Sequence, residues 1–486
     1  MSSSLKKNIL LNGINTVSGI VFPIITFPYA ARILLPDGIG AITFLNSIIN
    51  YIILFTSLGI PMYAVKEVAK FRDDIDKRDK ITIEIIILST LLCIIGYVAV
   101  FLLAQYIPQI HKQASLFYVL SLSIVFTSIG VNWFYQGIED FKFITIRAIV
   151  IRSLAALSLF LFVRNESDLL IYGIITVGST VGNNIINFFH LHKHINVRKI
   201  GFRELDIARH VKPSLQVFIL NLIISLYIQL NSIMLGFISG DEAVGYFTAG
   251  TKISHIGLTI IGSLSYVLLP RCSNLLSSGD RSGFAAIIKK SVKVTIALSL
   301  PMATGLIILA YPITVIFCGY DYLPSISVLY LNAPVIIFIS LTNVMGIQIL
   351  YPMDKVSIVI LSVSGGALVN MALNFGLIPL YDATGAAVAT LIAEFTVLLI
   401  QIISGKRFFP FGIRELFDIK YIVSTFIMAV AVILSILFIH SDYLRIIVGL
   451  STGFAVYLAS LLIMRDGLTM EMLKVLKRTL IKKQTS

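Results

Sequence analysis

Long apolar runs recur along the whole chain and constrain its fold more than any other feature. A helix needs about 20 residues to cross a hydrocarbon core roughly 30 Å thick. Of the 486 residues, 57% are hydrophobic and only 13% charged, too apolar for a single water-soluble core. We therefore predict an all-α, polytopic membrane protein with about 14 transmembrane helices. Their approximate bounds are 10–34, 39–64, 81–107, 115–136, 144–163, 169–190, 214–238, 245–269, 292–318, 326–350, 356–378, 386–404, 420–439 and 445–464.

The basic residues predict the orientation of these spans. If the N-terminus is cytoplasmic, the outer loops carry only Lys112, Arg164 and Arg445 of the 38 lysines and arginines. Because cytoplasmic loops carry the excess of positive charge, both termini are expected to be cytoplasmic. The net charge of +13 then fits the anionic membrane surface, and no nucleic-acid partner is expected.

A faint repeat relates the two halves of the chain. Residues 34–48 (LLPDGIGAITFLNSI) resemble residues 238–253 (ISGDEAVGYFTAGTKI), which aligns Gly40 with Gly245. The offset corresponds to about six spans, so both copies enter the membrane in the same direction, as parallel repeats of secondary transporters do. We predict three parts: a six-helix lobe over 1–205, a second over 206–405, and two further helices with a basic tail over 406–486.

Charged residues inside the spans are candidates for function, because a charge at the membrane centre costs about 2.5–3.5 kcal/mol on insertion scales. Arg152 and Lys252 each lie eight or nine residues into a span, too deep for simple snorkelling. Arg147 and Arg32 lie nearer span ends, where an interfacial anchor is an equally good interpretation. For Glu84, the anchor is the preferred interpretation.

Glu394 is the deep acid of the predicted spans. It could serve as a coupling-ion or proton site, or as the structural partner of Lys252, which we slightly prefer. His255 falls on the helical face of Lys252 and could titrate in a cavity, although a core histidine is the commoner role. His190 and His194 lie one turn apart without nearby thiols or carboxylates, so no metal site is expected.

Uncharged polar residues follow helical spacing on several spans. Residues four apart share one face of a helix, and such a face could line a wet cavity where amides bind sugar hydroxyls. Hydrogen bonding between helices is the competing interpretation. The favoured residues are on the first, second and seventh spans: Asn12, Asn15, Asn46, Asn50, Asn221 and Gln229.

No catalytic constellation or cofactor motif is recognisable. The sequence lacks a nucleophile elbow, a P-loop and a GxGxxG site, and its outer loops are too short for the active-site loop of a glycan enzyme. We therefore expect neither an enzyme nor a cofactor-binding protein.

Several stretches are similar to bacterial polysaccharide flippases of the multidrug/oligosaccharidyl-lipid/polysaccharide exporter superfamily. The resemblance covers residues from about 5 to 405. The stretches are PYAARILLPDGIGAITF (28–44), GIPMYAVKEVAKFRDD (59–74), NWFYQGIEDFKFITIR (132–147), DEAVGYFTAGTKIS (241–254) and GLIPLYDATGAAVATLIAEF (376–395).

The resemblance implies two six-helix lobes in a V around a cationic cavity, plus two C-terminal helices. It also implies transport of undecaprenyl-pyrophosphate-linked oligosaccharide units to the outer leaflet of the bacterial cytoplasmic membrane. Arg152 and Lys252 would bind the pyrophosphate, with Arg32 and Arg147 guiding it, since arginine suits phosphate. Unlike several drug exporters of the superfamily, residues 10–34 contain no acidic residue, so the energy coupling stays open.

Three alternatives remain. A cation-coupled drug or small-solute exporter would share the fold. A membrane-embedded glycan polymerase or ligase is disfavoured by the short outer loops. A scaffold for other polysaccharide-assembly proteins could use the charged loops 65–80 and 191–213.

Overall fold

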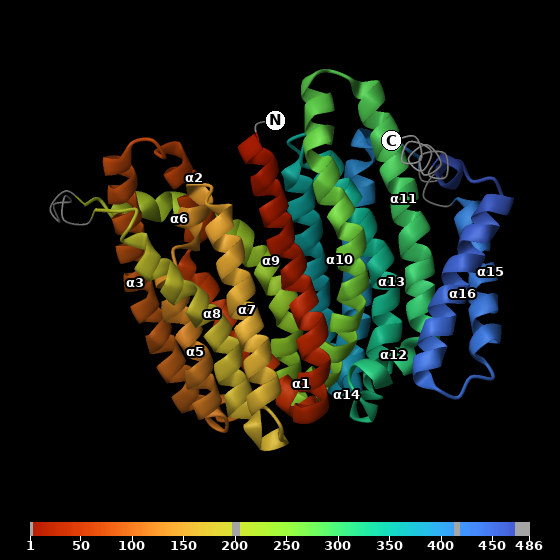
Figure 1. Cartoon of the computed structure of the whole chain (residues 1–486), viewed down its shortest axis with the longest axis horizontal. Helices are drawn as coiled ribbons and strands as arrows, with labels where there is room; N and C mark the ends of the chain where they lie inside the picture. The colour runs from red at the N-terminus through yellow and green to blue at the C-terminus, as the bar shows by residue number, and fades with distance from the viewer. Residues whose placement is uncertain (1–2, 197–204, 413–417, 472–486) are drawn as a thin grey trace, which may run out of the picture. The chain divides into compact units, whose positions relative to one another are not determined.

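The protein is described by a computed structural model that covers residues 3–196, 205–412 and 418–471. Within these ranges helices dominate (Figure 1), and no strand is found. The all-α prediction is thus confirmed. The α-helices are α1 (Ser3–Ser57), α2 (Ile60–Lys70), α3 (Ile75–Tyr106), α4 (Pro108–His111), α5 (Ala114–Ile129), α6 (Asn132–Gly137), α7 (Phe141–Phe162), α8 (Leu169–Leu191), α9 (Val211–Ile238), α10 (Asp241–Ser277), α11 (Arg281–Ile308), α12 (Ala310–Phe317), α13 (Ser325–Asn343), α14 (Val356–Gly405), α15 (Ile419–Ile436) and α16 (Asp442–Ile463).

Short segments complete these helices. A π-helical segment, η6 (Val344–Leu350), continues α13, and four 3-10 turns connect other elements: η1 (Glu166–Asp168), η4 (Ala208–His210), η5 (Tyr320–Tyr322) and η7 (Lys406–Phe408). Ten of the described helices are long and apolar enough to cross a membrane. Each predicted span falls on a helix, a helical arm or two consecutive helical elements, so the structure is consistent with about 14 crossings.

Two of the longest helices are each a pair of arms. In α1 the break is Leu35, with a left-handed φ of 56°, and in α14 it is Asp382, with a φ of 48°. Pro36 follows Leu35, and a proline disfavours helical geometry in the residue before it. The breaks fall between the first and second predicted spans and between the eleventh and twelfth.

Aspartate caps start several spans. Asp74, Asp140, Asp280 and Asp418 each accept a hydrogen bond from a backbone N–H in the first turn of α3, α7, α11 and α15. The N–H groups at a helix start lack partners within the helix, and an aspartate oxygen satisfies one of them. These caps fix where the membrane helices begin.

The chain divides into two compact units, Met1–Gly245 and Tyr246–Ser486. In the first unit α1 packs against α3, α5, α7 and α9. In the second unit α15 and α16 lie side by side (Figure 1), and they pack on α11 and α12. The two lobes divided at residue 205, and their V-shaped arrangement, stay predictions.

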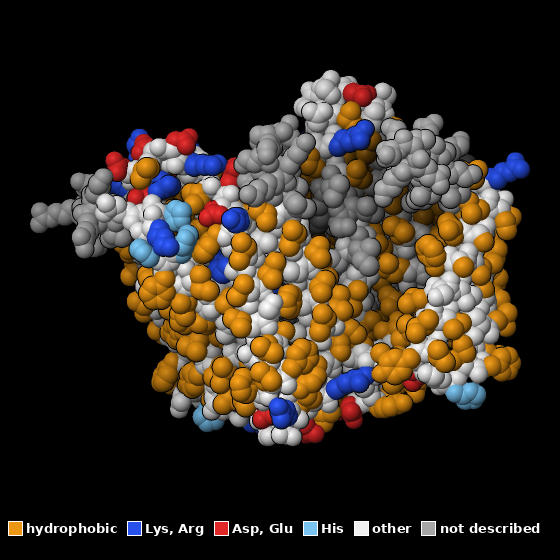
Figure 2. Space-filling model, in the orientation of Figure 1, with side chains coloured by type: hydrophobic (Ala, Val, Ile, Leu, Met, Phe, Trp, Pro, Cys, Tyr) orange, Lys and Arg blue, Asp and Glu red, His pale blue; other side chains and the backbone are white. Residues whose placement is uncertain are grey.

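Apolar side chains cover the sides of the helices, whereas charged side chains gather near the helix ends (Figure 2). Phe438, Phe454 and Ile463 are each at least 74% exposed. Burying such a side chain is worth about 1.5–3 kcal/mol, so a surface made of them requires lipid as its solvent. The chain is an integral, multi-pass membrane protein.

The two glycines aligned by the repeat meet within the first unit. A Cβ on Gly40 would lie 1.7 Å from the carbonyl oxygen of Asp241, and a Cβ on Gly245 would lie 2.0 Å from that of Pro36. Any side chain at either position would collide with backbone. Gly40 and Gly245 therefore allow the start of α10 to approach the backbone of the second arm of α1, which is the physical role of this part of the repeat.

Candidate functional site

Arg152 projects from α7 onto the first arm of α1. Its Nη1 donates hydrogen bonds to the backbone oxygen of Asn15 at 3.0 Å, to Asn15 Oδ1 at 3.1 Å and to Ser18 Oγ. Gly19 lies beside it, and even a Cβ there would be only in van der Waals contact with Arg152 Nη2, at 3.5 Å. The structure thus brings together Arg152 and Asn15, two residues that the sequence singled out separately.

The contacts of Arg152 are all with neutral groups. Within the described ranges it forms no ion pair, and its Nε and Nη2 donate no hydrogen bond to the protein. A guanidinium offers five N–H donors in a planar fork that matches phosphate oxygens. The first arm of α1 therefore holds the cation in place and leaves part of its fork available to an anion.

Arg147 is held differently. Its Nε donates to Asn183 Oδ1 of α8 and its Nη2 to Asn132 Oδ1 of α6, both at 3.0 Å. The side chain is 8% exposed, and among the described residues its Nη1 has no hydrogen-bond partner. The predicted pair of arginines on α7 is thus divided: Arg152 faces α1, whereas Arg147 faces α6 and α8.

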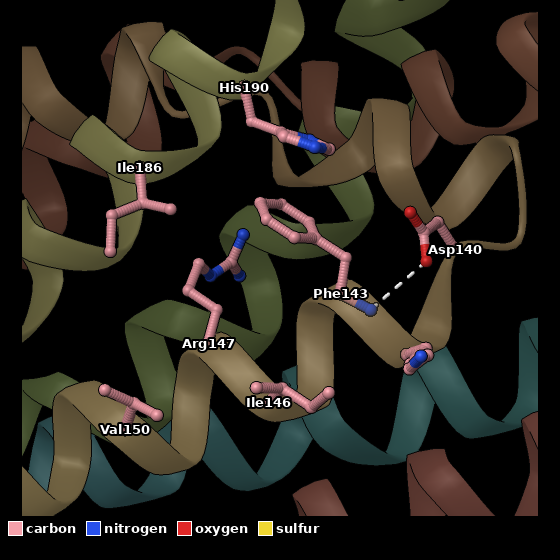
Figure 3. Close-up of a pocket in the computed structure, with 8 residues that line it drawn as sticks. Asp140, Phe143, Ile146, Arg147, Val150, Ile186 and His190 are labelled. Atoms are coloured by element: carbon pink, nitrogen blue, oxygen red, sulfur yellow. Dashed lines mark hydrogen bonds between the residues drawn. The ribbon is translucent and has the colours of Figure 1, made fainter. Parts of the chain in front are cut away.

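A pocket of about 400 Å³ opens beside Arg147, between α7 and α8 (Figure 3). Its eight lining residues are Asp140, Lys142, Phe143, Ile146, Arg147, Val150, Ile186 and His190. The His190 ring stacks on Phe143 with centroids 4.2 Å apart, and the Arg147 guanidinium lies 5.3 Å from the centroid of that ring. His190 therefore belongs to an aromatic cluster, and no group of metal-ligating side chains is found in the described part of the chain.

The remaining predicted cations are placed separately. Arg32 is an exposed residue of the first arm of α1. Lys252 lies on α10 in the second unit and is exposed, as is His255 three residues further along the same helix. Glu394 is 6% exposed in the second arm of α14. The pairing of Lys252 with Glu394 stays a prediction.

The predicted polar stripes occupy two parts of the first unit. Asn12 is exposed on the first arm of α1, and Asn46 and Asn50 are half-buried on the second arm. Gln229 is half-buried on α9, which packs on α1 through Phe44 with Phe237 and Phe55 with Phe218. These ring contacts place Gln229 at the depth of the second-arm asparagines. The side chain of Asn221 lies outside the described residues.

The sequence interpretation missed a buried polar network at the start of α3. Glu84 is fully buried, and it accepts hydrogen bonds from the Asp206 backbone N–H at 2.8 Å, from Arg209 and from His210 Nε2 at 2.8 Å. His210 Nδ1 lies 2.8 Å from the Tyr63 hydroxyl. We call these five residues the Glu84 network. The interpretation of Glu84 as an interfacial anchor is wrong.

A second pair continues this network. Asp79 is 3% exposed and accepts hydrogen bonds from Arg78 and, at 2.9 Å, from the backbone N–H of Asn196. Arg78 Nη2 also donates to the His194 carbonyl oxygen at 2.7 Å. Arg78 and Asp79 of α3 thus form hydrogen bonds with backbone groups of the segment that follows α8. The charged stretch over 72–80, in which acids and bases are mixed, was the available signal for such pairing.

The comparisons with known proteins agree with this fold. A family model described as polysaccharide biosynthesis protein matches residues 5–276. An Escherichia coli (strain K12) protein provisionally named O-antigen transporter is 28% identical over 395 residues, which are 80% of this chain and 94% of that protein.

Two solved structures share the fold. The lipid II flippase MurJ in an inward closed conformation has a TM-score of 0.70 at 18% identity, covering 94% of this chain and 99% of that chain. A multidrug resistance MATE family transporter in its inward-facing conformation has a TM-score of 0.62 at 14% identity, covering 82% and 97%.

Proposed function

Because the chain belongs to the polysaccharide biosynthesis protein family, we propose that it is a flippase for lipid-linked oligosaccharides. Its substrate is an undecaprenyl-pyrophosphate-linked repeat unit, moved by alternating access from the cytoplasmic to the outer leaflet of the bacterial cytoplasmic membrane. The name of the Escherichia coli relative, O-antigen transporter, supports the transport of a polysaccharide precursor. Both termini face the cytoplasm in this proposal.

The observation that carries the proposal is the environment of Arg152. This cation lies in a membrane-spanning helix and donates hydrogen bonds to Asn15 and Ser18. Among the described residues, no carboxylate pairs with it. A membrane-embedded cation is costly without a counter-charge, and a pyrophosphate group supplies one during transport. Arginine also binds phosphate through two parallel hydrogen bonds. The substrate's own charge thus offsets the cost of the site that recognises it.

We assign the other predicted residues by their positions. Lys252 provides a second cation for the pyrophosphate, and the exposed Arg32 guides it. Asn12, Asn15, Asn46, Asn50 and Gln229 contact the glycan through amide groups. Glu394 is buried and acidic, so it is the candidate for ion coupling or for the ion pair with Lys252. Arg147 does not share a face with Arg152, so we leave it out of this set.

The test is transport by Arg152→Ala and Lys252→Ala variants in a strain that lacks the gene. We expect each variant to accumulate at wild-type levels and to lose at least about tenfold of its transport, because a charge-assisted hydrogen bond contributes about 1.5–3 kcal/mol. The readout is the leaflet that holds the undecaprenyl-pyrophosphate-linked unit, together with surface polysaccharide.

Arg72→Ala is the matched control, since Arg72 forms an exposed ion pair with Glu139 and should transport normally. Wild-type transport by both test variants would refute the site. Normal glycan and unchanged lipid-linked pools in the deletion strain, combined with drug sensitivity, would instead indicate a drug or solute exporter.

A further inference from the structure

The groove between α7 and α8 has the shape and chemistry of a lipid site. Its walls include the apolar side chains of Ile146, Val150 and Ile186, which are 52%, 49% and 38% exposed. These side chains face outward on two membrane-spanning helices, where the bilayer is their solvent. An acyl chain lying along them would bury this apolar surface.

Cationic and donor groups lie at one end of the same groove. Lys142 is exposed in the first turn of α7, and His190 lies in the last turn of α8. Arg147 also lines the groove; it is more than nine-tenths buried, with its Nη1 unbonded among the described residues. Because Asn132 and Asn183 fix the other two nitrogens, the guanidinium is oriented before any ligand arrives.

One carboxylate also lines the groove, but it has another role. Asp140 Oδ1 accepts the Phe143 backbone N–H at 3.1 Å and so caps α7. Figure 3 shows Asp140 on the far side of Phe143 from Ile186 and Val150. The start of a helix also carries a partial positive charge. Lys142 and Arg147 together outweigh the single charge of Asp140, so the charged end of the groove is positive on balance, and the floor is apolar.

We propose that this groove binds an anionic membrane phospholipid. Its phosphodiester contacts Arg147 and Lys142, and one acyl chain lies against Ile146, Val150 and Ile186. Basic pockets between membrane helices bind the head groups of anionic lipids. The groove lies between α7 and α8, away from the contacts of Arg152 with α1, so we assign it to an exchanging membrane lipid and not to the carrier lipid of the transported substrate. The site is separate from Arg152, which faces α1, and does not depend on the proposed function.

The test is lipid binding by the full-length purified protein, measured by native mass spectrometry. The probes are dioleoyl phosphatidylglycerol and, with the same acyl chains, zwitterionic dioleoyl phosphatidylcholine. We expect phosphatidylglycerol to bind about tenfold more tightly. Lys142→Gln should weaken its binding about fivefold, since one basic residue near a membrane surface contributes about 1 kcal/mol. Arg147→Gln should weaken it about tenfold or more.

Further variants separate binding from folding and from general charge. Lys70→Gln removes an exposed cation of α2 outside the groove and should bind as the wild type does. Because Arg147→Gln also removes structural hydrogen bonds, Val150→Trp provides an independent test: it fills the groove, keeps every charge, and should weaken phosphatidylglycerol binding.

Three results would each overturn the proposal. Equal affinity of the wild type for the two phospholipids would show that the phosphodiester charge is not recognised. Equal losses in Lys142→Gln and Lys70→Gln would reduce the effect to general electrostatics. Displacement of phosphatidylglycerol by equimolar undecaprenyl phosphate, with Lys142→Gln weakening both lipids alike, would assign the groove to the carrier lipid.

Discussion

Two regions of the first unit treat buried charge in opposite ways. In the Glu84 network every charged group has an oppositely charged or hydrogen-bonding partner. The Glu84 carboxylate itself has three partners: Asp206, Arg209 and His210. Elsewhere in the same unit, Arg147 and Arg152 contact amides, a hydroxyl and an aromatic ring. Among the described residues, neither arginine forms an ion pair with a carboxylate. Buried charges that are complete within the protein indicate a structural role, whereas cations left without an acid indicate an external anion.

The strongest way to break this comparison is to remove Glu84. Glu84→Ala leaves the buried His210 and the 42% exposed Arg209 without their carboxylate, and a buried hydrogen-bonding group left without its partner costs about 1–3 kcal/mol. We expect a loss of that order in the free energy of unfolding, measured in mixed detergent micelles. Glu471→Ala is the control, because its exposed ion pair with Lys290 should contribute at most about 1 kcal/mol. Equal losses in both variants would contradict the structural role.

A second prediction supplies Arg152 with the acid that it lacks. In Ser18→Asp, a carboxylate replaces the hydroxyl that accepts the hydrogen bond from Arg152 Nη1. The new charge should neutralise the cation and repel an incoming pyrophosphate, so transport should fall about tenfold or more while the unfolding free energy does not fall. Ser18→Asn introduces a side chain of the same size without the charge and should retain most of the transport. Comparable losses in both variants would assign the effect to steric crowding.

The smallest effect is the response of the stability of the first unit to pH, through His194, whose carbonyl oxygen accepts a hydrogen bond from Arg78. Burial lowers the pKa of His194 below its usual 6.5, with the Asp140 carboxylate opposing this shift. Since the unfolded chain then binds the proton more readily than the folded one, stability is complete above about pH 6.5 and declines as the pH falls through the lower folded-state pKa. The thermal midpoint of the wild type should decrease between pH 7 and pH 5, and His194→Gln should flatten this decrease. An unchanged slope in His194→Gln would exclude this histidine as the source.

The sequence predicted the parts of the fold that depend on local pattern. Apolar runs located the spans. From the sequence, Arg147 is grouped with Arg152, although the two side chains face different helices in the structure. Contacts between distant segments could not be predicted in this way. The bond from Arg152 to Asn15 depends on how α7 packs on α1.

The burial of Glu84 was likewise not predictable from local sequence. Its distance along α3 suggested a position near the membrane interface, and no local pattern indicated that Arg209 and His210 fold over it. These partners lie more than 120 residues away along the chain. Whether a charged side chain is buried depends on the packed structure. Its role as a membrane anchor, a stabilising group or a binding group therefore depends on a partner that the local sequence does not identify.

The break at Leu35 has a consequence for how the chain is made. Only this residue of α1 departs from helical geometry between Ser3 and Ser57, so the turn between the two arms is very short. Two apolar arms joined by such a turn enter the membrane most favourably as a pair, since a helical arm satisfies most of its backbone groups internally. Insertion of this hairpin is therefore a paired step, in which no hydrophilic loop of appreciable length has to cross the membrane.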